Sequence, residues 1–169
     1  MAVTLLRHTT PDVEKGVCYG RTDLALASSF EAEFSALMEK LPRTSMILTS
    51  PLTRCRILAE RIGQVRGQPV TIAPDWIEMD FGRWEGIAWS DIPRAELNAW
   101  AAAFHDFDGH GGESVAALEA RVRAGLEAMK TGTLVVTHAG CIKAACAIRQ
   151  TGDGWDTQTG FGQTVTLSL

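Results

Sequence analysis

The chain has no apolar run near the 18 residues that a membrane-spanning helix needs, so the sequence excludes a helical membrane span. Its 169 residues contain no repeat, low-complexity stretch or linker-like boundary, and we expect one domain over residues 1–169. The four cysteines include no Cys-x-x-Cys pair, which is typical of free thiols in a reducing compartment. The opening residues MAVTLLRH lack the length and basic flank of a signal peptide. We therefore expect a cytoplasmic protein.

Positive charge is also scarce. Sixteen Lys and Arg stand against twenty Asp and Glu, and the net charge is −4. This balance argues against a general nucleic-acid or membrane partner, although it leaves a local basic pocket open. The overall composition is typical of a globular protein, with 46% hydrophobic and 21% charged residues. A chain of this length buries roughly 70% of its unfolded surface, so it needs no metal or disulfide to fold.

Strand-like and helix-like patterns alternate along the chain. Short apolar runs predict strands at 2–6, 45–49, 70–73, 133–137 and 164–168. Helical spacing predicts helices at 28–40, 50–66, around 91–103, 115–129 and 139–150. Ser50 and Pro51 have the residue types of an N-cap and a first helical position, so we expect the second helix to start there. This alternation predicts an α/β layer fold with a mainly parallel sheet.

Reactive side chains follow three of the predicted strands. Arg7-His8 follows the first, residues 50–54 follow the second, and residues 138–140 follow the fourth. Ligands of such folds bind beyond the carboxyl ends of the strands, so we expect these segments to converge. Arginine matches the oxygens of a phosphate, and a neutral histidine has one ring nitrogen free to attack phosphorus. The aperiodic loop 9–27 is long enough to be functional as well. The pattern favours chemistry on a phosphate group.

Five segments, in this order, resemble the histidine phosphatase family, which is also called phosphoglycerate-mutase-like. They are LLRH at 5–8, TSPLTRC at 49–55, EMDFGRWEG at 78–86, GGES at 111–114 and VTHAG at 136–140. They span nearly the whole chain, and their order makes the match specific. The resemblance implies a phosphoglycerate mutase-like, three-layer α/β sandwich with a mainly parallel central sheet, and no metal or other cofactor.

The resemblance also implies roles for individual residues. His8 would be the phosphorylated nucleophile, and Arg7 and Arg54 would clamp the phosphoryl group. His138 would stabilise that group during transfer. Glu78 would protonate the leaving oxygen and then activate water.

Two further carboxylates in the Glu78 segment keep that assignment open. Asp80 and Glu85 lie close to Glu78 in the chain, and either could serve as the proton donor.

The chain departs from the family pattern at three places. Thr9 stands where the family usually has glycine, and a β-branched residue disfavours positive φ, so the backbone there is extended or strained. The Thr9 hydroxyl could compensate by contacting phosphate. Residues 10–13 stand where an asparagine is common. Cys55 stands where alanine is usual, and we expect it to be a small core residue.

The substrate is expected to be a small-molecule phosphomonoester. CYGRTDLAL at 18–26 and the 78–86 segment look most like the α-ribazole-5′-phosphate phosphatases of cobalamin biosynthesis. The expected substrate-binding residues are Thr9, Tyr19, Arg21 and Ala139. Phe81 and Trp84 could complete the leaving-group pocket, or they could be core residues. The strand at 164–168 could pair with a second copy in a homodimer.

Several alternatives remain. A broad-specificity phosphatase or a phosphoglycerate mutase would use the same residues, although mutases of the family are expected to be much longer. A non-catalytic phosphate-binding protein could also retain the pocket. Residues 105–110 (HDFDGH) offer possible metal ligands, but the spacing matches no template and favours a solvated loop. Glu113 and Ser114 are expected to cap the helix that follows.

Overall fold

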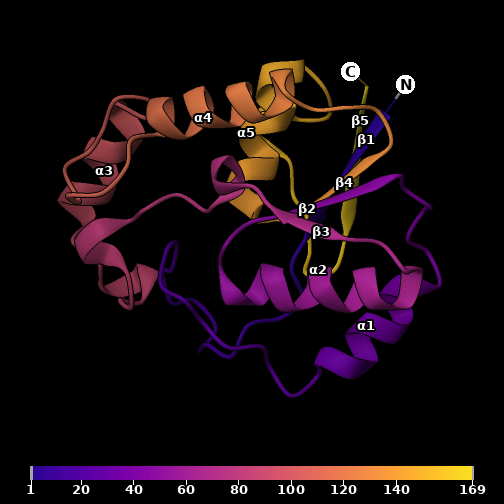
Figure 1. Cartoon of the computed structure of the whole chain (residues 1–169). Helices are drawn as coiled ribbons and strands as arrows, with labels where there is room; N and C mark the ends of the chain where they lie inside the picture. Colours follow the sequence, from indigo (N-terminus) through magenta and orange to yellow (C-terminus); the bar gives the residue numbers. More distant parts are fainter. Residues whose placement is uncertain (1, 169) are drawn as a thin grey trace.

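The computed structural model describes residues 2–168 (Figure 1). In chain order its main elements are β1 (Ala2–Arg7), α1 (Phe30–Met38), β2 (Met46–Thr49), α2 (Thr53–Arg66), β3 (Val70–Ile72), α3 (Arg94–Ala102), α4 (Val115–Glu127), β4 (Thr133–Thr137), α5 (Ala139–Arg149) and β5 (Thr164–Ser168). The predicted order of strands and helices is confirmed. No helix within residues 2–168 has the length and apolar character needed to cross a bilayer.

The strands form one sheet in the order β3-β2-β4-β1-β5. The pairs β3-β2, β2-β4 and β4-β1 are parallel, and β5 runs antiparallel to β1 at the edge. Arg7 lies opposite Thr137, so β1 and β4 end side by side. The register therefore brings the segments after these two strands together, and β2 ends on the other side of β4.

Helices cover both faces of the sheet, with α4 and α5 on one face and α1 and α2 on the other (Figure 1). Leu5 and Val135 point into the core under α4 and α5, whereas Leu6 and Val136 pack with α1 and α2. This alternation follows from the period of two along a strand. Strand β4 is buried on both faces, which explains its continuous apolar run. The expected α/β sandwich is confirmed.

A third core lies beside the sheet, in the lobe that contains α3 (Figure 1). Its buried residues are Cys18, Trp84 and Ile92, and partly buried aromatic side chains surround them. Trp84 is only 1% exposed, and its indole N–H donates to the Glu96 carboxylate at 2.6 Å. The aromatic richness of residues 74–113 thus builds a separate packing unit that flanks the ends of the strands.

Helix α2 starts later than predicted, with Leu52 as its N-cap and Thr53 as its first helical residue. The Thr53 amide and hydroxyl both donate to the Asp23 carboxylate, at 2.8 and 2.7 Å. The side-chain cap therefore comes from a loop 30 residues earlier, and the prediction that Ser50 caps this helix is wrong. Ser50 is left free to contact the segment after β4, because it belongs to the turn between strand and helix.

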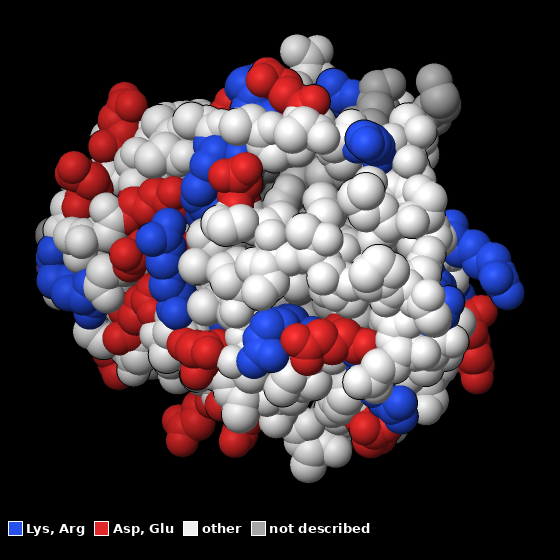
Figure 2. Space-filling view, viewed as in Figure 1, with Lys and Arg blue, Asp and Glu red and all other residues white. Residues whose placement is uncertain are grey.

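Charged side chains of both signs are interleaved on the face that Figure 2 shows, and they are not gathered by sign. This distribution agrees with the small net charge of −4. A broad field of one sign is therefore not a feature of this face.

Candidate active site

Two histidines meet where β1 and β4 end. The rings of His8 and His138 have centroids 5.2 Å apart and planes inclined at 62°. Both side chains are buried, and Arg54 is buried next to them at the start of α2. The convergence expected from the sequence is thus present in the structure.

The hydrogen bonding of His8 determines which ring nitrogen is reactive. Its Nδ1 lies 2.7 Å from the Thr9 carbonyl oxygen, and a carbonyl only accepts, so Nδ1 carries the proton. Nε2 consequently keeps its lone pair. Burial, together with the charges of Arg54 and Arg7, lowers the pKa of His8 from 6.5 to about 3. His8 is therefore a neutral imidazole near pH 7, which is the nucleophilic form.

His138 is held by groups from α2 and the turn before it. Its Nε2 lies 2.7 Å from the Ser50 hydroxyl and 3.4 Å from the Cys55 sulfur. Burial lowers the pKa of His138 well below its usual value, and the charges of His8 and Arg54 act in the same direction. Burial also raises the pKa of the Cys55 thiol, so this thiol stays protonated. Cys55 is a core residue as expected, and it contacts the second histidine as well.

Backbone carbonyls of the long loop orient Arg54. Its Nη1 donates to the Thr22 carbonyl at 2.7 Å and its Nη2 to the Gly20 carbonyl at 2.6 Å. The Tyr19 ring lies 5.3 Å from the guanidinium carbon. Within residues 2–168, the buried Nε has no hydrogen-bond partner. A buried donor of this kind fits an oxygen of an anion.

The second arginine approaches from β1. Arg7 donates from Nη1 to the Thr159 carbonyl at 2.7 Å, and its guanidinium carbon lies 3.9 Å from the centre of the Phe161 ring. Its Nε is also buried and lacks a partner in the described part of the chain. The two guanidinium groups therefore present positive charge and unused donors near His8.

Glu78 shares a cavity with His8, and so does Asp156 from a later segment. Glu78 is 9% exposed, and its two oxygens accept from the Met79 amide at 2.9 Å and the Gly140 amide at 3.0 Å. Asp80 accepts from the Gly82 amide at 2.8 Å and does not line this cavity. Glu85 accepts from the amides of the 19–22 turn and likewise does not line it. Of the three carboxylates in this segment, only Glu78 lines the cavity that contains His8.

A buried ion pair holds the Glu78 segment in place. Arg121 on α4 donates from Nε and Nη2 to the Glu113 carboxylate, at 2.7 and 2.9 Å. Its Nη1 donates to the carbonyls of Asp75 and Ile77, at 2.8 and 2.5 Å. Glu113 thus serves as a partner for Arg121, and only the Ser114 hydroxyl makes the expected cap, accepting from the Ala117 amide at 3.2 Å.

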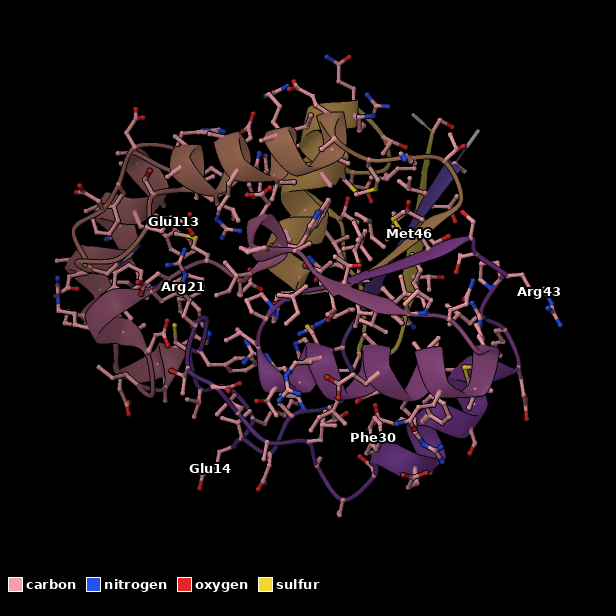
Figure 3. All side chains as sticks on the ribbon, in the orientation of Figure 1. Glu14, Arg21, Phe30, Arg43, Met46 and Glu113 are labelled. Atoms are coloured by element: carbon pink, nitrogen blue, oxygen red, sulfur yellow. The ribbon has the colours of Figure 1, made fainter. Side chains whose placement is uncertain are left out.

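Arg21 belongs to the same network and lies beside Glu113 (Figure 3). Its Nε donates to the Glu78 carbonyl at 3.3 Å, and Nη2 lies 3.6 Å from the Glu113 carboxylate. Arg21 does not line the cavity that contains His8. Its placement favours support of the Glu78 backbone over the expected contact with substrate.

A cavity of about 720 Å³ opens from His8 and Glu78. This volume suits a small molecule. The aromatic side chains that line it are Tyr19, Phe81, Trp89, Trp100, Phe104 and Trp155. Tyr19, Phe81 and Ala139 line the cavity, whereas Trp84 is a core residue.

Several cavity residues were not identified from the sequence. Trp89, Trp100, Phe104, Trp155 and Lys143 all line the cavity and come from separate segments of the chain. The only signal for the first three was the aromatic richness of residues 74–113. Spacing could not reveal their convergence, because the loops that connect these segments have no regular period.

Thr9 is accommodated without backbone strain. Among the described residues, Gln150 is the one non-glycine residue with positive φ, so Thr9 does not adopt the left-handed conformation. The Thr9 hydroxyl is buried and makes no hydrogen bond within residues 2–168. It is therefore a further donor available next to His8, although Thr9 itself does not line the large cavity.

The 105–110 segment does not form a metal site. In the part of the chain that the structure describes, no group of three or more His, Cys, Asp or Glu could hold a metal ion. His105 lies 3.7 Å from the Glu119 carboxylate, and His110 accepts from the Gly112 amide at 3.0 Å and packs on Trp84. These two histidines have structural contacts, and the metal alternative raised by the sequence is not supported.

Comparison with known proteins gives the following relatives. The family described as Histidine phosphatase superfamily (branch 1) matches residues 3–161. A protein named Phosphoserine phosphatase 1, from Hydrogenobacter thermophilus, is 26% identical over 85% of this chain and 74% of its own length. The crystal structure of TTHB049 from Thermus thermophilus has a TM-score of 0.81 at 28% identity and covers 98% of this chain and 92% of that chain.

A phosphoglycerate mutase from Thermus thermophilus tests the expectation that mutases of this family are much longer than this chain. Its crystal structure has a TM-score of 0.80 at 28% identity and covers 100% of this chain and 99% of that chain. The expectation that a mutase must be much longer is therefore wrong for this relative. Chain length does not separate the two activities here.

Proposed function

Because this phosphatase belongs to the histidine phosphatase superfamily, we propose that it hydrolyses phosphomonoesters through a phosphohistidine formed at His8. One observation carries the proposal. The Thr9 carbonyl holds the proton of His8 on Nδ1, which leaves a neutral Nε2 beside two guanidinium groups and in the same cavity as Glu78. A nucleophile, a cationic cradle and an acid are the three parts that this chemistry requires.

In the first step, Nε2 of His8 attacks phosphorus while the bond to the leaving oxygen breaks. Glu78, entering as a carboxylic acid, gives its proton to that oxygen, and an alcohol departs. The imidazole gains positive charge as the N–P bond forms, and the hydrogen bond from Nδ1 to the Thr9 carbonyl stabilises this charge. Arg7, Arg54 and His138 stabilise the oxygens of the group in transfer.

In the second step, water attacks the phosphohistidine and the N–P bond breaks. Glu78, now a carboxylate, takes a proton from the attacking water. Inorganic phosphate and neutral His8 are regenerated, and Glu78 is again a carboxylic acid. The cycle balances without a metal or another cofactor.

The proposal is tested by replacing His8 with asparagine, which keeps the polarity of the side chain and approximates its size. We expect turnover of any accepted phosphomonoester to fall by at least ~10³-fold and labelling by ³²P-substrate to disappear. His105→Asn is the matched control, because His105 is exposed and does not line the cavity. Full turnover in the His8 variant would refute the role of His8, and absence of a phosphoenzyme in the native protein would favour the non-catalytic alternative.

For the substrate, we propose a phosphomonoester with a planar, aromatic leaving group, and α-ribazole-5′-phosphate is the first candidate. The support is the aromatic lining of the cavity, in which the Trp89 and Trp100 rings stack at 6.0 Å with planes at 13°. Phosphoserine, suggested by the name of one relative, has an ionic leaving group for which this lining offers Lys143 and Asp156, whereas most of the wall is aromatic and favours a planar group. We expect kcat/KM for α-ribazole-5′-phosphate to exceed that for phosphoserine by at least ~10-fold. Equal values would favour a broad-specificity phosphatase.

The second candidate function is a phosphoglycerate mutase, favoured by the likeness to the solved mutase over the whole chain. The two activities are separated by incubation with 3-phosphoglycerate and 2,3-bisphosphoglycerate. We expect release of inorganic phosphate. Rapid interconversion of the 2- and 3-phosphoglycerates without phosphate release would favour the mutase.

A further inference from the structure

Phe161 is a large aromatic side chain that is 38% exposed and yet contacts two residues of the site. Its ring centre is 5.6 Å from that of His8 and 3.9 Å from the guanidinium carbon of Arg7. The chemistry proposed above assigns this ring no part. The short distance to Arg7 means that the guanidinium rests directly on the face of the ring.

The turn that carries Phe161 is joined to the end of β1 by backbone hydrogen bonds. The Gly162 amide donates to the carbonyls of Arg7 and His8, at 3.2 and 3.1 Å, and the Arg7 amide donates to the Gln163 carbonyl at 3.0 Å. Gly162 has φ of +68°, a conformation that favours glycine. The relation between Phe161 and Arg7 is thus set by main-chain contacts between the turn and the strand.

The two arginines of the site are supported differently. Arg54 donates to two backbone carbonyls and is fully buried, so its orientation is determined by hydrogen bonds. In the described chain, Arg7 has one such bond, to Thr159. Arg7 also lies within reach of the Tyr19 hydroxyl, and with one backbone hydrogen bond its guanidinium is less firmly oriented than that of Arg54. The ring of Phe161 restricts rotation of the Arg7 guanidinium by covering one face, and its quadrupole attracts the cation.

We propose that Phe161 is a positioning residue that orients Arg7 toward the phosphoryl group. The inference rests on the proposed function, since it assumes that Arg7 binds the phosphate of the substrate. With Nη1 held by Thr159 and one face held by Phe161, the buried Nε of Arg7 is an unpartnered donor in the described chain that fits a phosphate oxygen. Phosphate binding is strengthened because the cation is already oriented before the substrate arrives.

The test compares Phe161→Ala, Phe161→Leu and Phe161→Tyr with the native protein. We expect the Ala and Leu variants to lose about 3- to 30-fold in kcat/KM and to bind inorganic phosphate more weakly by a similar factor, because the aromatic face is gone. The Tyr variant keeps the face and should stay within about twofold of the native protein. The melting temperature should change little in all three, since the ring is partly exposed. Val65→Ala is the control, because Val65 is 56% exposed on α2 and does not line the cavity.

A double-mutant cycle identifies the partner of Phe161. In an Arg7→Ala background, Phe161→Ala should cause no further loss, because the residue that it positions is absent. An undiminished effect in that background would overturn the inference, and so would native behaviour of the Ala or Leu variant. If the native protein hydrolyses no phosphomonoester, the proposed function fails. Calorimetric titration of the same variants with inorganic phosphate still tests the inference in that case, and equal affinities would overturn it.

Discussion

The Gly140 amide donates to the Glu78 carboxylate at 3.0 Å, and no side chain fits at position 140. A Cβ there would lie 2.3 Å from Oε1 of Glu78. Gly140 lies in the first turn of α5, where alanine would favour the helix by about 1 kcal/mol. The absence of a side chain at Gly140 therefore leaves the space that the Glu78 carboxylate occupies. It allows the Glu78 carboxylate to reach the Gly140 backbone amide at the start of α5.

Replacing Gly140 with alanine should displace Glu78 while the fold is kept, because the carboxylate end of a glutamate can move away. We expect kcat/KM for alkyl phosphates to fall by about 10- to 10³-fold, as for the loss of a general acid. Aryl phosphates should lose less, because their leaving oxygen departs without a proton. Steady-state kinetics on both substrate classes provide the measurement, and an equal loss on both would point to a different acid.

The buried pair of Arg121 and Glu113 should contribute strongly to stability. Both side chains are largely buried, at 17% and 11% exposure, and Arg121→Ala would leave the Glu113 carboxylate without its main partner. We expect the free energy of unfolding to fall by about 2–4 kcal/mol, measured by urea denaturation. Arg123→Ala is the control, because Arg123 is 49% exposed and pairs with Glu119 at the surface. Its replacement should lower the free energy of unfolding by less than about 0.5 kcal/mol. Similar losses in the two variants would contradict this assignment.

Stability should depend on pH through the buried histidines. Folding lowers the pKa of His8 from 6.5 to about 3, so the unfolded chain binds more protons between these values. The free energy of unfolding should therefore rise with pH between about 3 and 6.5. The contribution of His8 should be fully present above pH 6.5 and should be lost as the pH falls toward 3. At pH 5 the His8 contribution alone should cost about 2 kcal/mol. His8→Asn should show a shallower pH dependence in urea denaturation, and an unchanged slope would show that His8 is not the group responsible.

Removal of metal ions should leave the activity unchanged. All parts of the proposed reaction are side chains, and the residues of the 105–110 segment make structural contacts instead. Dialysis against EDTA, followed by assay with and without added Mg²⁺ or Zn²⁺, provides the measurement. Loss of activity that a particular metal restores would refute the metal-independent mechanism.

The sequence by itself determined the layer architecture, and it is the source of the catalytic residues that we propose. The run 133–137 has three consecutive apolar residues in its middle, which is typical of a strand covered on both faces. The segments after β1, β2 and β4 were expected at one edge of the sheet, because parallel strands end at the same edge. His8 and His138 could therefore be assigned to that edge without coordinates, and the structure shows that their strands are neighbours.

Only the tertiary structure decided how these groups are held. The cap of α2 comes from Asp23, the support of Arg7 from Phe161, and the partner of His138 from Ser50. Each pair joins residues at least 30 positions apart through loops or turns that have no period, so no local pattern records the contact. The physical reason is that strands and helices repeat their chemistry along the chain. Side chains that orient a catalytic group need only be close in space.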